Sequence, residues 1–139
     1  MSSNLSNLRN TDLRNADLSG ANLEGADLSN LDLSGANLSG ANLIRANLSR
    51  ANLTGADLSV AVLFDCNLSR SRMAGANLTS AHLRGANLRY ADLTDSNLYG
   101  ADLSFADLIC VNLNDANLKY ANLYDAELAG ANLSCAIME

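Results

Sequence analysis

The side chains that could do chemistry in this 139-residue chain are few, and their types favour recognition over catalysis. His82 is the single histidine, and Cys66, Cys110 and Cys135 do not follow the spacing of a metal site. Serine is plentiful, but no base stands where it would activate a serine hydroxyl as a nucleophile. We therefore expect no enzyme activity, no metal and no cofactor.

Aromatic and apolar side chains are the first candidates for a binding surface. Tyrosine near aspartate is a composition typical of protein interfaces, and mutual stacking of the rings is the structural alternative. An exposed apolar group can also mark an interface. Alternatively, it can be a neutral sequence change that a stable scaffold tolerates. The candidate partner-binding residues are Tyr99, Phe105, Tyr120 and Tyr124 toward the C-terminus, and Ile44, Val60, Val62 and Phe64 earlier in the chain.

Arginines form the second candidate site. Arg50 and Arg70 lie twenty residues apart, and Arg72 follows closely. Like charges that stack destabilise each other unless something counters them, so these three arginines are candidates for contact with an anion or an acidic partner. The alternative is that they are solvated charges without a specific role.

A five-residue repeat must position all of these residues. Every fifth residue from Leu8 to Met138 is leucine, apart from Met73 and Met138 themselves. We call this position the centre of each repeat. The residue two before the centre is mostly alanine, and the residue one before it is mostly Asn or Asp. All nine glycines lie two residues after a centre.

A period of five fits neither a helix nor a straight strand. On a helix the leucines would advance by about 140° per repeat, because each residue turns about 100°. In a straight strand they would alternate between faces. A corner after every short extended segment resolves the conflict, since it keeps each centre on the inside. Four such corners close a square lap of about 20 residues, and the laps stack about 4.8 Å apart.

This geometry directs each residue inward or outward. The centre and the small residue two before it point inward, whereas the other three positions point outward. All six aromatic residues are then outside, and residues twenty apart lie above one another. Asn and Asp beside the centre are expected to hydrogen-bond the local backbone at the corners.

The motif A(D/N)LXX resembles that of the pentapeptide repeat family. It is seen in residues 36–40 (Ala-Asn-Leu-Ser-Gly) and 101–105 (Ala-Asp-Leu-Ser-Phe), and it runs from about residue 6 to the end. The resemblance implies an all-β fold, a right-handed quadrilateral parallel β-helix of about seven coils, forming a single domain over residues 1–139. The family has many bacterial and especially cyanobacterial members, mostly without a known biochemical role. One subset binds DNA gyrase by imitating DNA and protects cells from quinolones. Members of that subset often carry interrupting loops and a C-terminal dimerisation segment, whereas the repeats of this chain show no interruption and no helix-like tail.

Charge and hydropathy limit the kinds of partner. The formal net charge is −6 and the pI about 4.5, which disfavours direct binding of nucleic acid. No window approaches 18 consecutive apolar residues, so we expect no membrane span. The N-terminus lacks the pattern of a signal peptide, and an odd number of cysteines is typical of a reducing compartment, so we expect a cytoplasmic protein.

The two ends of a β-helix expose unpaired backbone and core. The centre Leu133 and the following Ile137 and Met138 lie in the last coil, and they predict a homodimer through this end. Leu5 is out of phase with the centres, so the first residues are expected to fold over the N-terminal lap.

Two functions follow from these observations. The first is a non-catalytic scaffold or protein-binding module whose protein partner is unknown. The alternative is a DNA-mimicking inhibitor or protector of DNA gyrase. DNA mimicry would require an acidic end on a narrow rod, and residues 1–90 have a net charge of +1 whereas residues 91–139 have one of −7. The other explanation of this charge is that Asp replaces Asn at the position before the centre, where either residue satisfies the motif.

Overall fold

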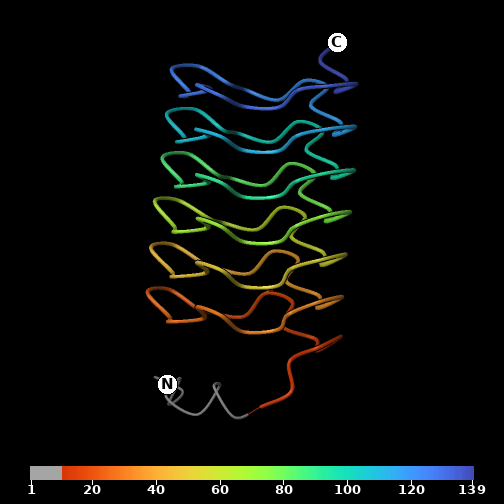
Figure 1. Ribbon diagram of the computed structural model, residues 1–139. Helices are drawn as coiled ribbons and strands as arrows, with labels where there is room; N and C mark the ends of the chain where they lie inside the picture. Colours follow the sequence, from red (N-terminus) through yellow and green to blue (C-terminus); the bar gives the residue numbers. More distant parts are fainter. Residues whose placement is uncertain (1–10) are drawn as a thin grey trace.

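The computed structural model describes residues 11–139, which wind into a rod of stacked laps (Figure 1). These residues contain no helix and no strand longer than one residue. Isolated parallel bridges link the laps, and each joins a residue to the one twenty positions later, from Asp17–Asn37 to Asn117–Ile137. The lap therefore has the length that the spacing of the leucines predicts. Each side of a lap is a short extended segment with one bridged residue.

Backbone hydrogen bonds between laps repeat with the sequence. On one side, the N–H of Leu48 donates to the carbonyl of Asn67 at 2.7 Å, and the N–H of Asn67 donates to Ala46 at 2.9 Å. At the following corner, the N–H of Arg50 donates to Ser69 at 2.9 Å. These bonds satisfy the backbone although no continuous strand forms.

Each corner is a β-turn that the centre residue begins. The N–H of Ala51 donates to the carbonyl of Leu48 at 3.0 Å, which closes the four-residue turn. The third residue of every such turn from Asn15 to Cys135 has a positive φ, as a type II turn requires. Glycine occupies nine of these positions, and sixteen other residues, including Val60 and Tyr120, adopt the same left-handed conformation.

The interior consists of columns of leucine and alanine. Every centre from Leu28 to Leu113 is buried, including Met73, and Cys66 replaces alanine in this interior. Burial raises the pKa of the Cys66 thiol, so this cysteine acts as a small apolar residue. Toward the C-terminal end the centres Leu123, Leu128 and Leu133 are only partly buried.

The four sides of the rod are named here by their bridged residues. Side I contains the column from Asp32 to Asn132, side II from Asp17 to Ile137, side III from Asn22 to Asn122 and side IV from Asp27 to Glu127. Each corner takes the names of the two sides that it joins. The chain runs through sides I, II, III and IV in this order in every lap.

Asn and Asp one residue before the centre stabilise the corners and link the laps. The side-chain oxygen of Asn37 accepts the backbone N–H of Ser39 at 3.1 Å, which confirms the expected local hydrogen bond. The amide of Asn37 also donates to Oδ1 of Asp17 in the preceding lap at 3.3 Å. Similar amide ladders occur on all four sides, for example Asn42 to Asn22, Asn47 to Asp27 and Asn52 to Asp32.

Two expectations concern residues outside the described part. Residues 1–10 include Leu5, so the folding of the first residues over the N-terminal lap stays a prediction. The expected number of about seven coils included these residues, so it also stays a prediction.

No helix of sufficient length and hydropathy to cross a membrane occurs among the described residues.

Candidate partner-binding surfaces

The four aromatic residues near the C-terminus form two pairs on neighbouring corners. Tyr99 and Tyr120 contact each other edge to face on corner II–III, with ring centroids 5.2 Å apart. Phe105 and Tyr124 do the same on corner III–IV at 5.6 Å. The four side chains are exposed by 42%, 66%, 48% and 65% respectively. The pairs border side III, where Asp102 and Asn122 form an amide ladder between them.

A hollow lies lower on corner III–IV. Its volume is about 440 Å³, and it is lined by Ile44, Arg45, Phe64, Asp65 and Arg84. Phe64 also packs against His82 of the next lap, with ring centroids 5.9 Å apart. The hollow therefore offers apolar contact between charged groups.

The predicted apolar group extends across side III. Ile44 and Phe64 meet at the hollow, whereas Val62 lies in the bridged column between Asn42 and His82. Val60 stands on the other corner, II–III, and is 53% exposed. A β-branched residue with φ of 50° is strained, and the exposed side chain of Val60 gains little from packing.

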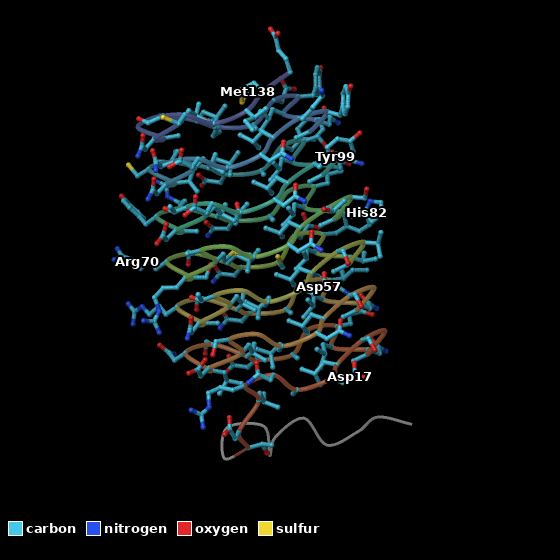
Figure 2. The ribbon with its side chains drawn as sticks, turned by 90° about the vertical axis from the view of Figure 1, so that its right-hand side faces the viewer. Asp17, Asp57, Arg70, His82, Tyr99 and Met138 are labelled. Carbon is cyan, nitrogen blue, oxygen red and sulfur yellow. The ribbon has the colours of Figure 1, made fainter. Side chains whose placement is uncertain are left out.

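The predicted arginines separate into two places. Arg50 and Arg70 stand in register on corner IV–I, as their twenty-residue spacing predicts, whereas Arg72 lies around the corner on side I. The guanidinium of Arg70 lies 5.0 Å from the ring centroid of Tyr90, a cation–π contact. Figure 2 shows Arg70 on the opposite edge of the rod from His82 and Tyr99.

Three features of the sites were not predicted from the sequence. Asp65 and Arg84 line the hollow, and the guanidinium of Arg84 lies 5.2 Å from the ring centroid of Phe105. Lys119 lies 5.1 Å from the centroid of Tyr120. The twenty-residue register was the signal for the hollow, because Ile44, Phe64 and Arg84 share one column. The cation–π contacts depend on side-chain conformations that the register does not specify.

Ion pairs link some of the exposed charges. Arg45 pairs with Glu24 at 2.6 Å, and Arg89 pairs with Asp107 at 2.9 Å. The ion pair with Asp107 raises the pKa of the Arg89 guanidinium. Within residues 11–139, one further ion pair involves an arginine, and it joins Arg14 to Asp12.

No cluster of three or more His, Cys, Asp or Glu that could hold a metal occurs among the described residues. Cys110 and Cys135 are exposed free thiols, and Cys66 is a buried one.

The last lap is less buried than the laps below it. Leu133 is partly buried, while Ile137 and Met138 are 54% and 48% exposed. Met138 lies at the C-terminal end of the rod (Figure 2).

Comparison with known proteins defines the class of protein. The family model for pentapeptide repeats matches in eight copies, over residues 4–30, 22–59, 32–70, 61–98 and 96–134. The chain belongs to the pentapeptide repeat family. Membership supports the right-handed β-helix that the motif implied. Among curated proteins, no sequence match was found.

Solved structures of other pentapeptide repeat proteins resemble the chain. QnrB1, a plasmid-mediated fluoroquinolone resistance protein, is 24% identical with a TM-score of 0.57. The match covers 89% of this chain and 66% of the QnrB1 chain, so this chain spans less than two thirds of QnrB1, and the likeness shows the fold alone. HetL, involved in heterocyst differentiation regulation in the cyanobacterium Nostoc sp. strain PCC 7120, is 35% identical, with 90% and 73% coverage and a TM-score of 0.30. Rfr23 of the cyanobacterium Cyanothece 51142 is 28% identical, with 88% and 91% coverage and a TM-score of 0.41.

Proposed function

We propose that this chain is a non-catalytic module that binds a partner protein through side III. The observation that supports this function is the pair of exposed aromatic contacts, Tyr99 with Tyr120 and Phe105 with Tyr124, on the two corners that border this side. Aromatic residues are enriched among the side chains that dominate protein interfaces. Because the rings already brace each other, they lose little conformational freedom when a partner binds.

Affinity capture with three purified baits tests this function. The baits are the wild type, a Tyr99→Ala, Tyr120→Ala, Tyr124→Ala triple variant, and an Arg72→Ala control that truncates a large exposed side chain on side I. We expect the wild type and the control to capture the same partner, and the triple variant to lose it. Capture of the same partner by all three baits would refute binding through side III.

A second function is DNA mimicry toward gyrase. It is favoured by the net charge of −7 over residues 91–139, because DNA carries a dense line of negative charge. A supercoiling assay with gyrase tests it. Inhibition of supercoiling, or protection from a quinolone, at micromolar protein is the expected result of mimicry. An unchanged assay removes this function and leaves the binding module.

The homodimer through the last coil is also a proposal. Exposed Ile137 and Met138 and the partly buried Leu133 support it. Sedimentation velocity should show a dimer that an Ile137→Asp, Met138→Asp variant converts to monomer. Monomer alone at tens of micromolar would contradict it.

A further inference from the structure

The charges of the rod fall into three bands along its length. Residues 11–40 have five acidic residues and Arg14, a net of −4. Residues 41–90 have six arginines and two aspartates, a net of +4, and residues 91–139 have eight acidic residues and Lys119, a net of −7. A basic band therefore lies between two acidic bands, although the whole chain is acidic.

The fold concentrates this basic band around side IV. Arg45 and Arg84 stand on corner III–IV, at one edge of this side. The opposite edge, corner IV–I, carries three more, Arg50, Arg70 and Arg89, whereas the sixth, Arg72, lies on side I. Of the two aspartates of the band, Asp57 lies on side II, so Asp65 is the single carboxylate of the band beside these five arginines. We call this surface, side IV and its two corners from Arg45 to Tyr90, the arginine face.

Two of the five arginines of the arginine face are neutralised by ion pairs. Arg45 pairs with Glu24 of the N-terminal acidic band, and Arg89 pairs with Asp107 of the C-terminal one. Arg50, Arg70 and Arg84 make no ion pair with any residue of the described range. These three guanidinium groups are therefore the ones available to an external anion.

Two of the available guanidinium groups are held in place by aromatic rings. Arg70 lies over Tyr90 and Arg84 over Phe105, at 5.0 and 5.2 Å from the ring centroids. A guanidinium that stacks on a ring keeps its N–H donors directed outward in its own plane, which suits bidentate binding of a carboxylate. The contacts reduce the side-chain freedom that binding would remove.

The hollow adds an apolar contact at the edge of this face. Ile44 and Phe64 line it beside Arg84 and Asp65. A large apolar side chain entering this hollow would place its neighbouring residues next to the arginines. The anion that fits is therefore part of a chain that also carries an apolar group.

The acidic bands limit the size of this ligand. The arginine face extends over two lap spacings, or about 10 Å. A nucleic-acid duplex laid along the rod would continue over the acidic bands, because its phosphates follow one another without a break. Laid across the rod, it is wider than the face, since its grooves alone measure about 12 and 6 Å. A short acidic segment of a protein avoids this repulsion.

We propose that the arginine face binds a short acidic segment of a partner protein, in which a large apolar side chain enters the hollow beside Arg84. This proposal rests on the proposed function in one respect, since both assume that the chain is a protein-binding module. The two surfaces adjoin at corner III–IV, where Arg84 contacts Phe105. The arginine variant and the tyrosine variant each change residues of one surface and both keep Phe105, so they separate the two proposals.

Fluorescence anisotropy tests the arginine face with a labelled peptide in which aspartates flank a single phenylalanine. The variants are an Arg50→Gln, Arg70→Gln, Arg84→Gln triple variant and an Arg72→Gln control, which removes an arginine of the same band on side I. We expect the triple variant to weaken binding at least about tenfold, since it removes three groups that can each form charge-assisted hydrogen bonds to the peptide. The control should bind like the wild type. Circular dichroism checks that all variants fold.

Further probes decide between kinds of ligand. A peptide with alanine in place of phenylalanine should bind several-fold more weakly, and one with lysine in place of the aspartates should not bind. The Tyr99→Ala, Tyr120→Ala, Tyr124→Ala variant should bind the acidic peptide like the wild type, which distinguishes this proposal from binding through side III. Three results would overturn it: no saturable binding of the acidic peptide by the wild type up to about 1 mM, equal loss in the Arg72→Gln control, or tighter binding of duplex DNA than of the peptide.

Discussion

The side-chain amide of Asn112 donates to Oδ1 of Asp92, twenty residues earlier, across 3.2 Å. Asn112 in turn accepts the amide of Asn132 at 2.9 Å. The ladder on side I therefore has a direction, in which each asparagine donates toward the N-terminal lap. Aspartate can only accept, so Asp92 begins this ladder. Asp17 and Asp27 likewise begin ladders on sides II and IV, and Asp32 begins an earlier one on side I.

An Asn112→Asp variant tests this direction. The substitution removes both donated hydrogen bonds of Asn112, including that to Oγ1 of Thr94 at 2.7 Å, and places a carboxylate above Asp92. We expect a loss of about 1–3 kcal/mol in the free energy of unfolding, measured by urea denaturation. Asp92→Asn is the control, since its oxygen still accepts, and it should change stability by less than about 0.5 kcal/mol. Equal effects of the two substitutions would show that the ladder has no preferred direction.

Ser96 offers a stabilising substitution. It occupies an interior position of side II that is mostly alanine, and its buried hydroxyl has no hydrogen-bond partner. Ser96→Ala should therefore raise the free energy of unfolding by about 1 kcal/mol, because a buried unsatisfied hydroxyl is unfavourable. Ser71 is the matched control. It is equally buried, but its hydroxyl donates to the carbonyl of Leu68 at 2.7 Å, so Ser71→Ala should give no gain. A gain in both variants would indicate a general preference for alanine.

Val60 and Gly40 test the strain at the corners. Both stand on corner II–III with positive φ, at 50° and 63°. Asparagine adopts this conformation more readily than a β-branched residue, so Val60→Asn should stabilise the fold by about 0.5–1 kcal/mol. Gly40→Val should destabilise it by about 1–2 kcal/mol, although nothing lies within 4 Å of the added Cβ. Thermal and urea unfolding measure both changes, and stabilisation by Gly40→Val would contradict the strain.

Asp32 gives the rod a dependence on pH. Hydrogen bonds from the side chain and the backbone N–H of Ser34, together with the amide of Asn52, lower the pKa of its carboxyl group. A pKa that is lower in the folded state contributes stability above the ordinary value near 4, and this stability is lost as the pH falls through the folded value. Asp32→Asn keeps the acceptor but cannot titrate.

The comparison is made by urea denaturation between pH 7 and pH 2. The stability of Asp32→Asn relative to the wild type should rise as the pH falls. A difference that stays constant over this range would show that the carboxylate contributes nothing that titrates.

The fold could be predicted from the sequence because one rule repeats without interruption. Centres, small inward residues and corner glycines each recur every five residues, so the lap length and the outward positions of Tyr99 and Tyr120 followed from spacing alone. The same register placed Arg70 above Arg50. The contact of Arg84 with Phe105 did not follow, since it depends on how two long side chains turn at the surface.

Because every bridge joins residues twenty apart, the rod consists of equivalent laps that could be removed one at a time. Removing one whole lap, for example residues 61–80, would leave every remaining residue above its own column, because each residue would move down by one level. Removing five residues instead would turn all later laps by one side relative to the earlier ones. If the five residues lie between Phe64 and Arg84, Arg84 would leave the column that it shares with Ile44 and Phe64, with every centre still inside. Surfaces on this scaffold can thus be recombined by deletion alone, without any change to the interior.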